Sequence, residues 1–372
     1  MRYQIEHMDT SGNRLNTIQA FTRLDYVRTV NTVGAMTLTM PIKKNEKTGE
    51  EWQYEDFRVG QLLEIWRKKE GSLELQGETA YILQDWQFYT TSKSESMIGL
   101  YATDLNCLLD TRIIAYAAAS AQAEKTDYAD DMIKEIVDEN LVSATTAARN
   151  ISNLSIAPHL SASQSITKGY AWRNVLRTCQ EIAEAATEAG TKTYFDIVRT
   201  DRATFQLRTY TGQRGRDHSR LSGDMRLVGE KYGNLVTPSF GTYHAGEWNY
   251  VYAGGQGEEA DREIVEVSDA TRIGTGYPFN RKEKFTDARH ADTTALITSS
   301  ANQSLGEGVP KQIMSGNLVD TPGMQYGVHY GFGDILSVEA FGFSVDCHVA
   351  TVSCTVDASK YEQITVRLRG EL

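Results

Sequence analysis

The sequence lacks any apolar run approaching the roughly 18 residues that a helix needs to cross a bilayer, which argues against a membrane span. It is also short of cations, with 38 Lys and Arg against 49 Asp and Glu and a formal net charge of −11. Because phosphate contacts need clustered Lys and Arg, this balance argues against a general binder of nucleic acid or anionic membranes. The N-terminus has no apolar segment typical of a secretory signal, so we expect the folded chain first in a cytoplasm.

Cysteine is scarce, and the four cysteines show none of the C-x-x-C spacing that metal and redox sites use. In a reducing cytoplasm such residues are typically buried free thiols, which we expect here. They are Cys107, Cys179, Cys347 and Cys354.

The common catalytic motifs are missing as well. The glycine-rich stretch 252–262, YAGGQGEEADR, lacks the lysine and hydroxyl with which a P-loop holds phosphate and magnesium, so it is interpreted as a tight turn between strands. The sequence has no H-E-x-x-H, no two histidines at i, i+4 and no G-x-S-x-G. We therefore expect no enzyme, no cofactor and no metal site.

Two catalytic alternatives stay open. Cys179 could meet His218 or His244 in space as a nucleophile with its base, although it lies on the apolar stripe of a predicted helix, where a core thiol is the simpler interpretation. Paired carboxylates could serve a glycosidase if their environments separated their pKa values, but adjacent acids in a polar run are usually solvated. These are Asp130 with Asp131 and Glu258 with Glu259.

Length and periodicity predict a mainly β chain with an α+β insert. At roughly 150 residues per domain, 372 residues predict two or three domains. Residues 1–110 alternate apolar and polar side chains with no helical pattern between, which favours a first antiparallel β-barrel domain. The alternating positions include Tyr3, Ile5 and His7, then Met36, Leu38 and Met40, then Leu63 and Ile65.

Residues 111–225 change to helical spacing and are predicted as an α+β insert domain, a helix-and-hairpin module. The first helix has Thr126 or Asp127 as its N-cap and acids on its wet face, and Gly190 is the expected C′ residue of the second. A hairpin across residues 194–209 follows. The apolar face of the first helix is Met132, Ile133, Ile136, Val137 and Leu141, and that of the second is Trp172, Val175, Leu176, Cys179, Ile182, Ala183 and Ala186.

From residue 226 to 372 the strands return, with a short helical segment near 288–305, and a second β-barrel domain is predicted. The stretch YGFGDILSVE at 330–339 repeats the pattern of FRVGQLLEIW at 57–66. In both, a glycine (Gly60, Gly333) and a polar residue (Gln61, Asp334) precede two aliphatic residues. One copy in each predicted barrel indicates the same strand of a duplicated domain.

Aromatic residues alternate on two predicted strands, so that each set lies on one face. Barrel lining and a partner interface are both consistent with this pattern. The residues are Trp86 and Phe88 on one strand and Trp248, Tyr250 and Tyr252 on the other.

Residues 242–290 resemble the tail-hub family of long-tailed phages. In that family a strand ending in a Gly-Gly-x-Gly turn is followed by an acidic step with Asp-Arg, a strand and an Arg-x-Glu-x-x-x-Asp-Ala-Arg run. The matching residues here are Gly254, Gly255, Gly257, Asp261, Arg262, Arg281, Glu283, Asp287, Ala288 and Arg289.

Two further segments resemble the same family, so the resemblance covers nearly the whole chain in order. The closing stretch 330–372 is similar to its terminal strands, where a Gly-Asp pair, here Gly333 and Asp334, opens a strand. Residues 102–116, ATDLNCLLDTRIIAY, resemble its leucine-rich step from the first barrel into the insert. The residues of that step are Asp104, Leu105, Leu108, Leu109, Arg112 and Ile113.

The resemblance implies a structural hub like those of contractile-tail baseplates and type VI secretion spikes. Two similar barrels per chain would form, in a homotrimer, a pseudo-sixfold ring that joins the tail tube to the tip and lets viral DNA pass without specific binding. The implied partners are the distal tail protein ring on the tube side, the tape-measure protein and tip fibre or spike proteins. The implied location is the tail tip of the virion, after assembly in the host cytoplasm.

Two other classes remain as alternatives. A tail-associated peptidoglycan hydrolase would clear cell-wall substrate in zymography. A glycan-binding module for host recognition would be a monomer that binds sugars.

Overall fold

The computed structural model describes residues 3–42, 49–69, 74, 76–115, 123–170, 172–257, 261–274, 276–289, 291, 293–359 and 361–371. Two compact units make up the chain. Unit 1 consists of Met1–Pro238 and Gly316–Arg369, and unit 2 consists of Ser239–Ser315 and Gly370–Leu372. The predicted three-domain division at residues 110 and 225 stays a prediction.

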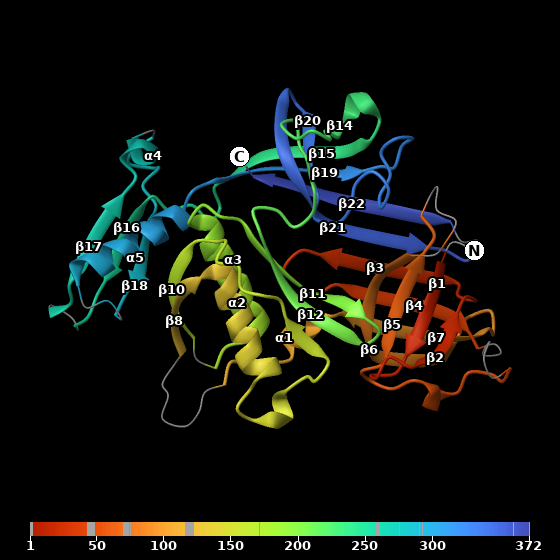
Figure 1. Cartoon of the computed structure of the whole chain (residues 1–372). Helices are drawn as coiled ribbons and strands as arrows, with labels where there is room; N and C mark the ends of the chain where they lie inside the picture. Colours follow the sequence, from red (N-terminus) through yellow and green to blue (C-terminus); the bar gives the residue numbers. More distant parts are fainter. Residues whose placement is uncertain are drawn as a thin grey trace. The chain divides into compact units, whose positions relative to one another are not determined.

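The N-terminal strands of unit 1 form where the sequence alternates apolar and polar residues (Figure 1). Met36, Leu38 and Met40 point into the core and are buried, as predicted, together with Ile5 and Ile65. The elements are β1 (Tyr3–Met8), β2 (Arg14–Ile18), β3 (Arg23–Thr29), β4 (Ala35–Pro41), the 3-10 helix Tyr54–Asp56, β5 (Leu62–Arg67), β6 (Gln76–Thr90) and β7 (Ser96–Asp104).

The insert places two helices beside two small sheets within unit 1. Its core joins the apolar faces of both helices to Phe195, Ile197, Phe205 and Leu207 of the hairpin. The elements are α1 (Cys107–Asp110), β8 (Ala123–Tyr128), α2 (Ala129–Val137), the π-helix Asp138–Val142, the 3-10 helix Ala147–Arg149, β9 (Leu154–Ile156), β10 (Ser165–Tyr170), α3 (Val175–Glu188), β11 (Thr193–Asp201) and β12 (Thr204–Thr211).

The strands after the insert extend the same large sheet, in which β21 lies next to β3. Along the sheet the order is β15-β19-β22-β21-β3-β4-β7-β6-β5-β1-β2, while β20 pairs with β13, β14 and β21. The elements are β13 (Asp217–His218), β14 (Leu227–Gly229), the 3-10 helix Glu230–Tyr232, β15 (Leu235–Tyr243), β19 (Lys311–Leu318), β20 (Ile335–Ala340), β21 (Phe343–Val356) and β22 (Glu362–Glu371).

Unit 2 is a three-stranded sheet with one helix packed on a single face. Ile297 and Ala301 of the helix contact Val251 and Ala253 of the central strand in a small apolar core. The helix α5 (Thr294–Glu307) begins six residues later and ends two residues later than the segment predicted near 288–305. The other elements are β16 (Tyr250–Gly254), β17 (Ile264–Ser268), α4 (Ala270–Gly274) and β18 (Glu283–Asp287).

The mainly β fold with helices in the insert is confirmed. The two closed barrels stay a prediction, because the strand pairs among the described residues run as an open order from β2 to β15. All four cysteines are free and buried, as predicted. Over the described part of the chain, no helix is both long enough and apolar enough to span a membrane.

Three details of the insert differ from the sequence predictions. Thr126 and Asp127 belong to β8, so neither caps α2, whose N-cap position is Tyr128. Trp172 lies before α3 with a φ of 53° and a side chain 62% exposed, so it is not part of the apolar stripe. The predicted end of the helix is confirmed, in contrast, because Gly190 follows the C-cap of α3 with a φ of 98°, as expected of a C′ glycine.

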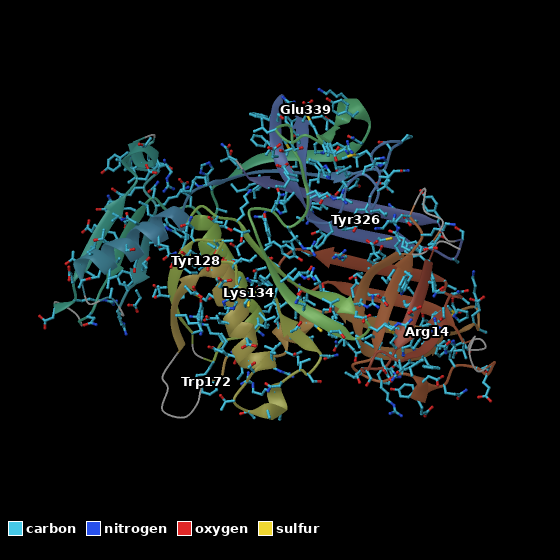
Figure 2. All side chains as sticks on the ribbon, in the orientation of Figure 1. Arg14, Tyr128, Lys134, Trp172, Tyr326 and Glu339 are labelled. Atoms are coloured by element: carbon cyan, nitrogen blue, oxygen red, sulfur yellow. The ribbon has the colours of Figure 1, made fainter. Side chains whose placement is uncertain are left out.

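The third difference concerns the acids of α2. The prediction placed Asp130 and Asp131 on a wet face, but both are buried, as is Lys134, whose Nζ lies 2.9 Å from Asp131 and 3.9 Å from Asp130. Figure 2 labels Lys134 on its helix. The helix is covered on several sides because α3, β8, β11 and β12 all pack against it. Glu258 and Glu259, the other predicted carboxylate pair, lie outside the described residues.

Candidate functional site

The large sheet, whose strands β15 and β19 begin in one unit and end in the other, contains the same five-strand arrangement twice. The first copy has the order β3-β4-β7-β6-β5, and the second has β15-β19-β22-β21-β20. Residue pairs between the long strands match one for one: Leu83 faces Ala102 in the first copy, and Val349 faces Leu368 in the second. Both partners differ by 266 positions (349 − 83 and 368 − 102), and the offset holds for all eight pairs of the second ladder, from His348–Arg369 to Val356–Glu362.

The irregularities of the two ladders also coincide. In the first copy the register shifts between Leu83 and Asp85, and in the second it shifts between Val349 and Thr351, again 266 positions on. A bulge inserts one residue and bends the strand, and bulges are conserved features of a fold. A bulge at the same position in both ladders therefore reflects a shared fold. The shared bulge is strong evidence that the two copies are one repeated unit.

The sequence echo that suggested a duplication lies at the start of equivalent strands. Gly60 precedes β5 with a φ of 90°, and Gly333 precedes β20 with a φ of 84°, a conformation that favours glycine. The next residues, Gln61 and Asp334, are both buried and accept backbone hydrogen bonds from Arg58 N and Arg216 N. The glycine turn and the buried polar residue therefore serve the same local purpose in both copies.

One chain joins its two copies by direct strand pairing. Residues 351–356 of β21 pair antiparallel with residues 24–29 of β3, so that the second copy extends the first. Thr355 Oγ1 donates to Asp25 Oδ1 at 2.7 Å on the outer face of this junction. On the inner face Cys354 and Val356 complete the apolar core of the first copy.

Unit 2 interrupts the second copy at a defined place. In the first copy β3 and β4 form a short hairpin across residues 30–34, whereas the equivalent strands β15 and β19 are separated by most of unit 2. The matched motif of the sequence therefore lies in an insertion between two strands of the repeat.

Part of the predicted motif comes together at one end of the unit 2 sheet. Arg262 donates to the carbonyl oxygens of Gly254 and Gly255 and forms an ion pair with Asp287, which also contacts Arg289 at 3.3 Å. A Cβ on Gly254 would lie 2.5 Å from Arg262 Nε, so the guanidinium needs a glycine at this position. The motif thus closes the turn between β16 and β17.

A second part of the motif lies on the sheet face opposite α5. The guanidinium of Arg281 lies 3.6 Å from the ring centre of Tyr250, donates to Tyr252 Oη at 3.0 Å and pairs with Glu283 at 2.5 Å. Phe285, on the same face of the neighbouring strand, is 53% exposed. Tyr250 and Tyr252 are therefore half-buried on a face that no described helix covers. Trp248, predicted to share that face, instead packs against the apolar core beneath α5 and donates from Nε1 to the Ser304 carbonyl.

The remaining motif residues hold turns in place. Gly257 has a φ of 99°, and Asp261, whose backbone oxygen lies 2.5 Å from a Cβ built there, is exposed. Asp104 accepts hydrogen bonds from Gly34 N at 2.6 Å and Asn106 N at 3.1 Å, and burial raises its pKa to about 7. Leu108 is half-buried in α1, and the Arg112 carbonyl accepts from Val175 N at the start of α3.

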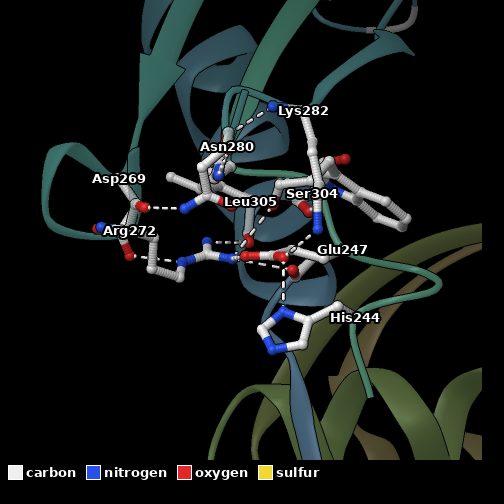
Figure 3. Close-up of polar contacts among 11 residues, drawn as sticks. His244, Glu247, Asp269, Arg272, Asn280, Lys282, Ser304 and Leu305 are labelled. Atoms are coloured by element: carbon white, nitrogen blue, oxygen red, sulfur yellow. Dashed lines mark hydrogen bonds and ion pairs between the residues drawn. The ribbon is translucent and has the colours of Figure 1, made fainter. Parts of the chain in front are cut away.

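A buried carboxylate organises the segment of unit 2 that precedes β16 (Figure 3). Glu247 accepts hydrogen bonds from Lys282 Nζ at 2.5 Å and from His244 Nδ1 at 2.8 Å, and Arg272 lies 3.8 Å away. Arg272 also pairs with Asp269 and donates to the Gly308 carbonyl. Burial opposes the ionisation of Glu247, but the hydrogen bonds from Lys282 and His244 outweigh it and hold its pKa below the usual range.

We expect acid to loosen this segment. Because the pKa of Glu247 is lowered by folding, its stabilisation is complete above its unfolded pKa of 4.5 and is lost as the pH falls through the folded value. Glu247→Gln should speed amide exchange of residues 244–249 about 10-fold or more at pH 7, the loss of a charge-assisted bond of roughly 1.5–3 kcal/mol. Hydrogen exchange read by mass spectrometry measures this. Glu283→Gln, an exposed control, should leave the exchange unchanged, and equal effects of both variants would contradict the assignment.

The catalytic alternatives find little support in the site geometry. Burial raises the pKa of the Cys179 thiol to about 12, so the thiolate that a nucleophile needs is scarce at neutral pH. Asp127, Glu135 and His159 hold possible metal-ligand atoms within 4.8 Å of one another, but the Lys125 ammonium already lies 3.0 Å from Glu135. A cation would have to displace that lysine.

One polar cavity of unit 1 is small, at about 200 Å³, below the roughly 300 Å³ of typical ligand sites, while a second, lined by residues such as Lys125, Glu135 and His159, has a volume of about 570 Å³. Two charged side chains of the smaller cavity pair with each other, since Arg199 lies 2.6 Å from Glu64. The lining includes Arg28, Glu64, Glu78, Asp104, Asp196 and Arg199.

Sequence reasoning missed the buried ion pairs that hold the repeat together. Arg67 at the end of β5 forms two hydrogen bonds with Glu362 of β22, and both side chains are at most 3% exposed. A signal was present, since Arg67 follows Leu63 and Ile65 at alternating positions and therefore points to the core. Its partner, nearly 300 residues away, has no such signal.

Comparison with known proteins places these features in a family. The model of the family described as Siphovirus ReqiPepy6 Gp37-like protein matches residues 5–368. No curated protein matches the chain in sequence.

Solved structures share the fold at low sequence identity. The 43 kDa tail protein of prophage MuSo2 from Shewanella oneidensis superposes with a TM-score of 0.57 and 10% identity, covering 99% of this chain and 98% of that chain. The tail protein from Neisseria meningitidis MC58 gives 0.55 and 12%, covering 99% and 97%. A chain of the Francisella PdpA-VgrG complex gives 0.54 and 10%, covering 100% of this chain and 57% of that chain.

Proposed function

Because the chain belongs to the family of Siphovirus ReqiPepy6 Gp37-like proteins, we propose that this phage tail protein is the structural hub of the tail tip. The observation that carries the proposal is the repeat with its constant offset and shared bulge. Each copy is the body of one predicted barrel domain, residues 1–110 and 226–372, with residues 111–225 as the insert between them. The motif residues of unit 2 are structural in this proposal.

The repeat supports a trimeric ring by symmetry. A tail tube of sixfold symmetry meeting a threefold tip needs a ring with six equivalent positions made from three chains. Two similar units in one chain supply this number, whereas six single-unit chains would not convert the symmetry. The direct pairing of β21 with β3 within the chain supports the proposal that neighbouring units of such a ring are joined by strand pairing.

The proposed ring joins the distal tail protein ring and tape-measure protein to tip fibre or spike proteins in the virion, after assembly in the host cytoplasm. Its acidic balance suits a DNA conduit, since carboxylates facing the lumen repel phosphate and leave passage unhindered. The role is structural and not enzymatic. A strongly basic lumen in an assembled particle would contradict the conduit.

Mass measurement of the purified chain tests the proposal. Native mass spectrometry or light scattering should find a species of three chains, and immunoelectron microscopy should place it at the tail tip of virions. A protein that stays monomeric alone and beside its tail partners, and is absent from virions, would contradict the hub. Clearing of cell-wall substrate in zymography would favour a peptidoglycan hydrolase, and sugar binding by a monomer would favour a glycan-binding module.

A further inference from the structure

Two strand edges that are paired in one copy of the repeat have no described partner strand in the other copy. In the first copy β3 pairs with β4 on one side and with β21 on the other. Its equivalent, β15, pairs with β19 and ends the sheet order of the described strands. Likewise residues 351–356 of β21 are paired on both sides, whereas the equivalent residues 85–90 of β6 form a described ladder with β7 alone. Each open edge is the counterpart of an edge that is paired elsewhere in the chain.

Burial of the equivalent side chains reflects this difference. Val352, Cys354 and Val356, which lie next to β3, are at most 1% exposed. Trp86 and Phe88, at the positions of Val352 and Cys354, are only half-buried.

The cover along this edge comes from a side chain and not from a strand. Thr90, at the position of Val356, is exposed, while the ring centre of Tyr54 lies 5.4 Å from that of Trp86 and 5.8 Å from that of Phe88. The first copy thus lacks, along this edge, the covering strand that the second copy has.

We propose that β15 of one copy of this chain pairs antiparallel with Asp85–Thr90 of β6 in a second copy, as β3 pairs with β21 within the chain. The proposal rests on the hub function and identifies the surface through which one copy of the chain contacts the next. Pro238 has no N–H to donate, so we place the ladder on residues 239–243 of β15. Asp85 is the one charged side chain on either segment, so no like charges oppose the pairing.

The pairing is heterologous, because the edge that each chain offers differs from the edge that it receives. Such contacts generate a closed ring when the rotation closes. With β21–β3 inside the chain and β15–β6 between chains, three chains would alternate the two kinds of junction six times. The half-buried Trp86 and Phe88 would then lie beneath a strand at every inter-chain junction, as Val352 and Cys354 do at every intra-chain junction.

Disulfide trapping in the full-length chain tests the register. One cysteine replaces Asp85, Gln87 or Tyr89, and a second replaces each residue from Ser239 to Tyr243 in turn. Because a disulfide needs Cα atoms about 4.4–6.8 Å apart, only directly facing positions should link. Non-reducing gels should show covalent species of up to three chains for one best partner of Gln87→Cys. In an antiparallel ladder, the best partner of Asp85→Cys lies two residues later and that of Tyr89→Cys two residues earlier.

The matched control pairs Gln87→Cys with Asn317→Cys. Asn317 lies on β19, beside Thr237 and one strand in from the edge, and should not link. Native mass spectrometry of the same samples distinguishes the β15–β6 edge pairing from the trimeric hub itself. Trimers without any linked pair, or best partners that move in the same direction, would overturn the edge pairing and leave the hub standing. Monomers throughout would overturn both. Adjacent positions in the set replace any variant that fails to fold.

Discussion

Replacing Arg67 with methionine is expected to lower the free energy of unfolding of unit 1 by about 3–5 kcal/mol, the usual cost of breaking a buried ion pair from one side. Arg67 Nη2 lies 2.5 Å and Nε 3.1 Å from the two carboxylate oxygens of Glu362, and Nη1 donates to the Tyr326 carbonyl at 3.4 Å. Methionine would leave the Glu362 carboxylate buried without its guanidinium. Urea unfolding followed by circular dichroism measures the loss.

The comparison with Arg23→Met makes this test specific. Arg23 pairs with Asp25 at 2.5 Å, but the two side chains are 62% and 31% exposed, so its loss should cost less than about 1 kcal/mol. Combining Arg67→Met with Glu362→Gln should recover part of the stability, because the second change removes the unpaired charge. If Arg67→Met cost no more than Arg23→Met, the pair would not be holding β5 to β22.

Local sequence patterns predicted the elements well because they depend on near neighbours. Period-two alternation located strands such as β4, whose Met36, Leu38 and Met40 are buried. Helical spacing located α2 and α3, and Gly190 correctly marked the end of α3. The prediction that Trp172 lies on the apolar face of α3 was wrong. An aromatic residue at helical spacing can equally belong to the preceding loop, and spacing alone does not distinguish the two.

Pairings between distant strands could not be predicted from the sequence. The echo of Gly60 and Gly333 suggested a duplication, but the constant offset and the shared bulge became visible only in the residue pairs of the sheet. The junction of β3 with β21 joins segments more than 300 residues apart and carries no local signal. The candidate motif came from a resemblance, and its geometry around Arg262 and Arg281 came from the structure.

Charged residues were the least predictable part of the core. Asp131 lies in a run of acids that sequence reasoning places in water, yet it is buried because the loop after β9 covers it. Its carboxylate accepts from the backbone of Leu160 at 3.0 Å and Ser161 at 2.8 Å. Lys134 Nζ donates to Asp131 at 2.9 Å and to the Pro158 carbonyl at 2.9 Å, and Asp130 lies 3.9 Å away. The loop and the helix thus share one buried charge cluster.

Lys134→Met is expected to destabilise the insert by about 3–5 kcal/mol, because it leaves two buried carboxylates without their cation. The measurement is hydrogen exchange of residues 129–142 at pH 7, which should quicken by at least 100-fold. Arg177→Met is the control, since Arg177 is 80% exposed and pairs with Glu181 at 3.7 Å on α3. Its effect should stay below about 1 kcal/mol.

The stability of the native protein and that of the Lys134→Met variant should change with pH in opposite directions. Burial alone would raise the pKa of Asp131, but hydrogen bonds from Lys134, Leu160 and Ser161 outweigh it and lower the pKa to about 2, against 3.8 unfolded. In the native protein this stabilisation is complete above about pH 3.8 and is lost as the pH falls through about 2. Without Lys134 the buried carboxylates gain by protonation, so Lys134→Met should recover relative to the native protein as the pH is lowered from 7 to 3. A deficit that stayed constant over this range would show that Lys134 acts through packing and not through its charge.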